Sequence, residues 1–141
     1  MKYFFDTSVL VSVAIMRHPD HGASLAVYLK ANLGNACCAG HSLAELYATL
    51  TRLPGSQRLS ADEALLFLDD VRSRLTIIAL EAPAFYSAIA SAAASNIVGG
   101  TIYDMLLAQC ALQAEAEIIY TWDVADSSRL GPAIAKRVQT P

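Results

Sequence analysis

The sequence predicts an α/β fold with a three-layer α/β/α arrangement around a parallel sheet of four to five strands. Short apolar segments alternate with longer segments of helical periodicity along the 141 residues. Such alternation typically gives parallel strands joined by right-handed crossovers. The short segments are apolar throughout, as expected for strands covered on both faces. We expect residues 1–141 to form a single domain, because this length suits one hydrophobic core.

The strand candidates are short and mostly apolar. The first four are Lys2–Phe5, Ala36–Ala39, Thr76–Leu80 and Glu117–Thr121, and Lys136–Gln139 is the candidate for a short fifth. Two neighbouring helices are expected between the second and third strands, which makes the fold more helical than a flavodoxin-like one.

The helix candidates end at Pro, Gly or Asn signals. They are Thr7–Met16, Ala23–Ala31, Ser42–Arg52, Ser60–Leu75, Pro83–Asn96 and Ile102–Gln113. The helix at 60–75 has the clearest amphipathic pattern, with Leu65, Leu66, Leu68, Val71 and Leu75 at helical spacing.

The composition excludes several classes of protein. Hydrophobic residues make up 55% and charged residues 16% of the chain, which is unlike a disordered segment. No apolar run approaches the roughly 20 residues of a membrane span, and the apolar stretch at the N-terminus is too short for a signal peptide. We therefore expect a cytoplasmic protein. Cys37, Cys38 and Cys110 form no C-x-x-C pair, which argues against zinc and thioredoxin-like chemistry. Cys37 and Cys38 are expected in the core, the usual place of free cysteines.

Four acidic residues occupy unusual places in this pattern. Asp6 follows the first strand and Asp123 the fourth, while Glu45 and Asp104 lie near the starts of helices. Doubly wound sheets place their sites at the carboxyl ends of the strands. If the first and fourth strands are neighbours, the four carboxylates converge on one pocket.

Clustered carboxylates repel one another and raise each other's pKa values unless a cation lies between them. Carboxylate oxygens favour Mg²⁺, with Mn²⁺ as a substitute. Such a cation can polarise a phosphodiester and activate water for its hydrolysis. With a net charge of −3, nucleic acid would have to meet a local basic patch or a metal that reverses the local charge.

Helix capping is the alternative explanation for two of these acids. Ser42-Leu-Ala-Glu45 and Thr101-Ile-Tyr-Asp104 match the [ST]-x-x-[DE] pattern of helix starts, as does Ser60-Ala-Asp-Glu63, for which we expect no catalytic role. Taken singly, Glu45 and Asp104 are better explained as caps. Asp6 is harder to explain in this way, because a carboxylate after an apolar strand is partly buried and needs a partner or a metal.

The same segments resemble the motifs of PIN domains. The resemblance rests on Phe5-Asp6-Thr7-Ser8, Leu43-Ala44-Glu45-Leu46-Tyr47, Ile102-Tyr103-Asp104-Met105-Leu106-Leu107-Ala108 and Thr121-Trp122-Asp123-Val124-Ala125-Asp126, which come in the family's order. The stretch at 50–55 is similar to one in the VapC-type branch. The chain departs from the family at Ser8, where many relatives have Asn, and at Ser127, where many have Phe.

The resemblance implies a PIN-like fold and an endoribonuclease that acts as the toxin of a toxin–antitoxin pair. It also implies a Mg²⁺/Mn²⁺ site, an RNA substrate, a homodimer and a small cognate antitoxin. Asp6, Glu45, Asp104 and Asp123 carry over as catalytic and metal-binding residues. Further candidates for supporting roles are Ser8, Thr121 and Asp126.

Two other functions remain open at this point. An aspartyl-phosphate phosphotransfer domain also places Asp after its first strand, but the haloacid-dehalogenase type needs a second Asp where this chain has Ser8. In a non-enzymatic binding module, the acids would be caps and no metal would bind.

Several further side chains have two interpretations. His18 and His21 have H-x-x-H spacing, but an exposed loop is the expectation. His41 is expected to serve the start of its helix, although it can reach Glu45. Tyr103 and Trp122 can stack a base, but packing in or at the rim of the core is the expectation.

Overall fold

The computed structural model describes all residues 1–141 and contains one parallel sheet of five strands. The strands are β1 (Tyr3–Phe5), β2 (Ala36–Ala39), β3 (Thr76–Ile78), β4 (Ile118–Tyr120) and β5 (Val138–Gln139). Their order is β3-β2-β1-β4-β5, and every pair is parallel. The predicted neighbours, β1 and β4, lie side by side at the centre of the sheet.

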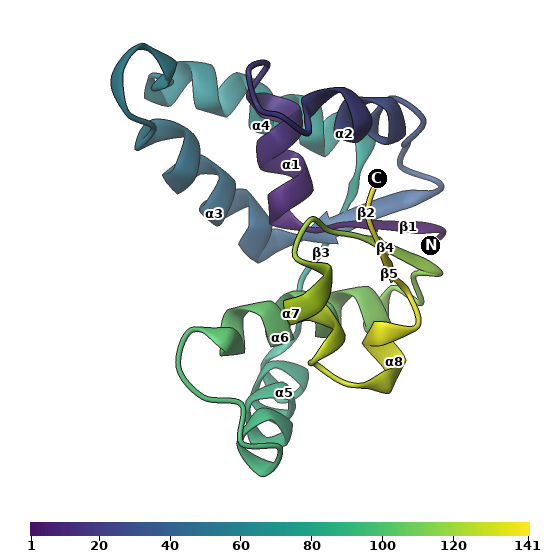
Figure 1. Ribbon diagram of the computed structural model, residues 1–141. Helices are drawn as coiled ribbons and strands as arrows, with labels where there is room; N and C mark the ends of the chain where they lie inside the picture. The colour runs from purple at the N-terminus through teal and green to yellow at the C-terminus, as the bar shows by residue number, and fades with distance from the viewer.

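Helices cover both faces of the sheet (Figure 1). One layer contains α1 (Thr7–Ala14), α2 (His21–Tyr28), α3 (Gly40–Thr51) and α4 (Ala61–Arg74), with a 3₁₀ turn at Gly55–Gln57 between the last two. The other contains α5 (Ala82–Ala94), α6 (Thr101–Gln113), α7 (Val124–Ser128) and α8 (Pro132–Ala135). This arrangement confirms the predicted three-layer α/β/α fold. No helix is long and apolar enough to cross a membrane.

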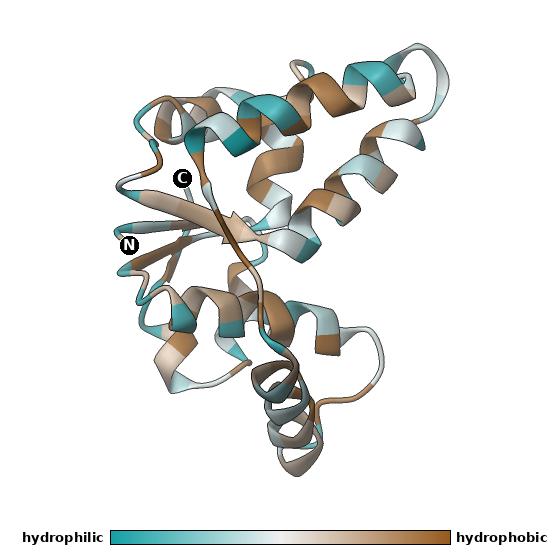
Figure 2. Ribbon diagram, turned by 180° about the vertical axis from the view of Figure 1, so that it is seen from behind, coloured by the Kyte–Doolittle hydropathy of each residue, from teal (hydrophilic) through white to brown (hydrophobic).

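Each face of the sheet has its own hydrophobic cluster. Successive strand residues point to opposite faces, so Phe5 and Cys38 belong to the cluster beneath α1–α4. Phe4 and Cys37 belong to the cluster formed with α6 and α8. Both cysteines are fully buried, as predicted, and the strands are mostly hydrophobic in Figure 2.

The pairing of β1 with β4 continues just beyond the strands. Phe5 pairs with Tyr120, and the N–H of Asp6 donates to the carbonyl oxygen of Tyr120 at 3.0 Å. Asp6 therefore lies beside the residues that follow β4, at the carboxyl edge where sites of parallel sheets form.

Two predictions about the helices were wrong. Leu65 and Leu66 are 52% and 71% exposed, because the buried side of α4 follows the spacing of Ala64, Val71 and Leu75, and those two leucines lie outside it. The helix α2 begins at His21, inside the segment expected to be loop. The short helices α7 and α8 were not predicted, since five and four residues are too few to show a period.

Candidate functional site

Two hydroxyl groups hold the carboxylate of Asp6. Its Oδ2 accepts hydrogen bonds from Ser8 Oγ at 2.7 Å and from Thr121 Oγ1 at 2.8 Å. Both donors are neutral, so they orient the carboxylate without cancelling its charge. Oδ1 has no protein donor among these contacts, which leaves it available to a ligand.

The same hydroxyls also bind the loop after β4. Ser8 Oγ accepts from the N–H of Trp122 at 3.0 Å, and Thr121 Oγ1 accepts from the N–H of Asp123 at 3.0 Å. Each hydroxyl thus donates to Asp6 and accepts from the backbone that carries Asp123. Ser8, which departs from the usual Asn of the motif, ties α1 to this loop through its contact with the N–H of Trp122.

The structure brings all four predicted acids to one cleft. Asp6, Glu45, Asp104 and Asp123 line a hollow of about 410 Å³. A smaller cavity of about 60 Å³ shares three of these acids and adds Asp126 in place of Glu45. Asp6, Asp104 and Asp123 are therefore central, with Glu45 and Asp126 on different sides of them.

The electrostatics of the cleft couple these acids to one another. Burial is the main cause that raises the pKa of Glu45, Asp104 and Asp123 above ordinary values, and the negative charge of Asp6 raises each of them further. For Glu45, His41 and the Thr7 hydroxyl oppose this shift. No Lys or Arg forms an ion pair with any of the four predicted acids.

The donor set of the cleft fits a hard divalent cation. It offers several carboxylate oxygens with like charges and no thiolate, and Mg²⁺ and Mn²⁺ prefer such ligands. The structure contains no group of three or more His, Cys, Asp or Glu side chains that could hold a metal ion as placed. The fit therefore rests on donor chemistry, and Mg²⁺ commonly keeps several water ligands.

The capping explanation for Glu45 and Asp104 is wrong. The helix α3 begins at Gly40 and α6 at Thr101, and neither has a side-chain cap hydrogen bond. Glu45 instead lies 3.3 Å from Thr7 Oγ1 and 3.5 Å from His41 Nε2. The third match to the pattern is a true capping box, in which Ser60 and Glu63 exchange hydrogen bonds of 3.1 and 3.0 Å.

Asp6 and Asp123 also occupy N-cap positions without capping. They precede α1 and α7, and neither side chain accepts a cap hydrogen bond. Asp is among the preferred N-cap residues. Here both carboxylates line the cleft instead, where they are available to a ligand.

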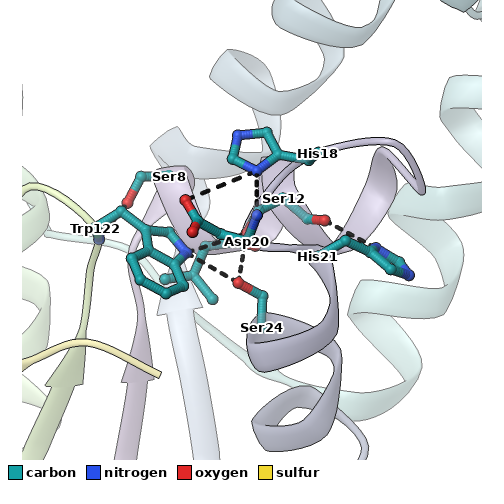
Figure 3. Close-up of polar contacts among 8 residues, drawn as sticks. Ser8, Ser12, His18, Asp20, His21, Ser24 and Trp122 are labelled. Atoms are coloured by element: carbon teal, nitrogen blue, oxygen red, sulfur yellow. Dashed lines mark hydrogen bonds and ion pairs between the residues drawn. The ribbon is translucent and has the colours of Figure 1, made fainter.

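Sequence reasoning missed a second wall of the cleft. His18 and Asp20, from the loop between α1 and α2, line it together with Trp122. The N–H of Asp20 donates to His18 Nδ1 at 3.1 Å, whereas His21 Nδ1 lies 3.0 Å from the carbonyl oxygen of Ser12 (Figure 3). The two histidines therefore have separate partners and do not form a metal pair.

Trp122 is held by buried serines of two helices. Its Nε1–H lies 2.9 Å from Ser24 Oγ and 3.3 Å from Ser12 Oγ, and the two hydroxyls are 2.6 Å apart (Figure 3). Both serines are fully buried. The network fixes the indole as part of the wall, which no periodic pattern in the sequence indicates.

The chain is similar to known proteins over most of its length. A family model described as PIN domain matches residues 3–125. "Ribonuclease VapC27" of Mycobacterium tuberculosis is 33% identical over 113 residues, which cover 80% of this chain and 79% of that protein. The chain belongs to the PIN-domain family. Its similarity to this relative places it in the VapC-type branch, and the matched region of the PIN domain includes all four predicted acids.

Solved structures show the same PIN fold at low sequence identity. Mycobacterium tuberculosis VapC20, described as a sarcin–ricin loop cleaving toxin, has a TM-score of 0.73 at 15% identity, covering 91% of this chain and 95% of that one. VapBC2 from Rickettsia felis, bound to a DNA fragment from its promoter, has a TM-score of 0.67 at 20% identity, covering 99% and 98%. The architecture of this PIN-domain chain is thus common to VapC proteins.

Proposed function

We propose that the chain is a Mg²⁺- or Mn²⁺-dependent endoribonuclease and the toxin of a toxin–antitoxin pair, acting as one domain in the cytoplasm. The observation that carries this proposal is the arrangement around Asp6. Two hydroxyls orient its carboxylate, and three more carboxylates line the same cleft. The ribonuclease relative at 33% identity supports the choice of reaction.

In this proposal, Asp6, Asp104 and Asp123 would hold the metal, with Glu45 as a further ligand or acting through bound water. Ser8 and Thr121 occupy Oδ2 of Asp6 and keep Oδ1 for the ligand. When bound, a divalent cation supplies the positive charge that polarises a phosphodiester and activates water. Asp126 lies 3.2 Å from the guanidinium of Arg129, so we give it a supporting place.

Hydrolysis in this cleft uses water and no protein nucleophile. The three thiols are buried, and burial raises the pKa of Cys37 and Cys110 to about 11 and that of Cys38 to about 12. Thiols with such pKa values stay protonated at neutral pH and are poor nucleophiles. Water attack on RNA gives 5′-phosphate and 3′-hydroxyl ends, as the family resemblance implies.

Unpaired RNA is the proposed substrate, because its backbone and bases can be splayed into a cleft. A small cognate antitoxin and a second copy of the chain are the proposed protein partners. Similar solved structures include VapBC from Salmonella typhimurium, bound to DNA. Exposed hydrophobic side chains, including Leu65 and Leu66 on α4, provide apolar surface for such contacts.

The decisive experiment compares the wild-type chain with Asp6→Asn on end-labelled, unpaired RNA. The wild type should cleave in Mg²⁺ or Mn²⁺ and stop in EDTA, while Asp6→Asn should largely lose activity at unchanged fold. Asp62→Asn, an exposed acid in the first turn of α4, is the matched control and should cleave normally. RNA cleavage by Asp6→Asn in EDTA, with contaminating nuclease excluded, would refute the mechanism.

A further inference from the structure

Two exposed aromatic rings stack on each other beside the acidic cleft. The rings of His41 and Tyr103 are parallel within 2°, and their centroids are 5.4 Å apart. Tyr103 is 52% exposed, and His41 is also exposed. The pair connects the first turns of α3 and α6, the two helices that carry Glu45 and Asp104.

The stacked pair is next to the acids of the cleft. His41 Nε2 lies 3.5 Å from Glu45 Oε1, and Tyr103 directly precedes Asp104 in the chain. His41 also lines a separate hollow of about 270 Å³, whose other walls are mostly apolar and include Phe85 and Leu106. The pair therefore borders both the acids of the cleft and this mostly apolar hollow.

Packing within the fold does not account for the exposure of both rings. The two rings are parallel and offset, and 52% of Tyr103 stays exposed despite this contact. The cleft has no Lys or Arg paired to its four acids, and the chain carries a net charge of −3. Base stacking on aromatic rings is a contact that adds RNA affinity without a basic group.

We infer that the His41–Tyr103 pair is a nucleobase platform, on which an unpaired base next to the scissile phosphate extends the stack. This inference rests on the proposed ribonuclease function and names how the substrate is held. It replaces the expectation of simple rim packing for Tyr103 and of a helix-start role for His41. Tyr103 provides the exposed ring on which the base stacks. His41 packs against Tyr103 and also contacts Glu45.

The test combines Tyr103 variants with RNAs that lack one base. Binding is measured by fluorescence anisotropy in EDTA, where no cleavage occurs, and KM and kcat are measured separately in Mg²⁺. Tyr103→Ala should weaken binding and raise KM by about tenfold with kcat little changed, whereas Tyr103→Phe should behave as wild type. On an RNA with an abasic residue next to the cleavage point, the wild type and Tyr103→Ala should bind equally.

Two controls separate the platform from the stability of the fold. Tyr86→Ala removes another exposed tyrosine, from α5, and should leave RNA binding unchanged. Tyr103→Leu keeps an apolar side chain of similar bulk but has no aromatic face. It should lose RNA affinity as Tyr103→Ala does, and it replaces Tyr103→Ala in the test if that variant fails to fold. If the wild type cleaves RNA but the Tyr103→Ala and Tyr103→Leu variants keep wild-type Kd and KM on every RNA, the proposed base platform is wrong. The proposed nuclease function is then unaffected. A wild type that neither binds nor cleaves RNA overturns both.

Discussion

Thr121 Oγ1 donates a hydrogen bond of 2.8 Å to Oδ2 of Asp6, across a separation of 115 residues in the chain. Thr121 is fully buried, and its hydroxyl also accepts from the N–H of Asp123. One hydroxyl therefore links the ends of the two central strands and positions two of the proposed catalytic acids.

Thr121→Val should damage both stability and activity. The substitution keeps the shape of the side chain but removes one donor to Asp6 and leaves the Asp123 N–H without its acceptor. We expect a loss of about 1–3 kcal/mol in the free energy of unfolding and a clear fall in RNA cleavage. Denaturant titration and cleavage assays measure the two effects. Thr51→Val, which removes only a bond to a carbonyl within α3, should retain cleavage; equal activity of both variants would contradict the link.

Asp104→Asn should stabilise the metal-free protein while abolishing activity. Burial, followed by Asp6, Asp123 and Asp126, raises the pKa of Asp104, so its charge disfavours the folded state at neutral pH. This loss of folding stability develops as the pH rises from the ordinary pKa of 3.8 through the raised pKa of Asp104 in the folded protein. The gain in the variant should stay below about 1 kcal/mol, since the carboxylate is partly exposed. Thermal unfolding in EDTA at several pH values checks this, and added Mg²⁺ should stabilise only the wild type; a variant less stable in EDTA would contradict it.

The two kinds of [ST]-x-x-[DE] match should behave in opposite ways. Ser60→Ala removes a capping box at the start of α4 and should lower the free energy of unfolding by about 1 kcal/mol without changing cleavage. Glu45→Gln should reduce cleavage strongly with little loss of stability, because Glu45 caps nothing. Denaturation and activity measurements on both variants distinguish a capping residue from a catalytic one. A loss of stability in Glu45→Gln but not in Ser60→Ala would contradict the roles given to these two residues.

Ser24→Ala should change the surroundings of the chain's single tryptophan. The variant removes the 2.9 Å partner of Trp122 Nε1 and leaves Ser12 at 3.3 Å. We expect a shifted emission spectrum and a loss of about 1 kcal/mol in the free energy of unfolding. Because Trp122 forms part of the cleft wall, KM for RNA should also rise. Ser73→Ala, on the exposed surface of α4, is the control. Identical emission spectra for the wild type and both variants would contradict the hydrogen-bond network around Trp122.

The main features of the fold and the acids were predictable because they follow from periodic and positional rules. An apolar strand that ends in an acid predicts a carboxylate at the sheet edge, and parallel order brings Asp6 and Asp123 together. The sequence could not distinguish a capping glutamate from a catalytic one, because Glu45 and Glu63 occupy the same [ST]-x-x-[DE] pattern. Only the backbone starts of α3 and α4 distinguish them.

The features that were not predicted do not follow from a repeating pattern in the sequence. His18 and Asp20 reach the cleft through the path of the loop between α1 and α2, and loop conformation depends on local turns rather than on repeating spacing. Leu65 and Leu66 fit a helical pattern, yet a helix can meet its neighbours along only part of an apolar stripe, and the remainder stays in solvent.

The long separation between Asp6 and Thr121 has a consequence for synthesis. A chain made from its N-terminus presents Asp6 early, but the donor Thr121 and the acid Asp123 come more than a hundred residues later. Contacts between such distant residues form slowly, because the closure of a long loop precedes any gain from the contact. A ribosome that translates this message therefore carries a nascent chain without an assembled cleft until β4 is released.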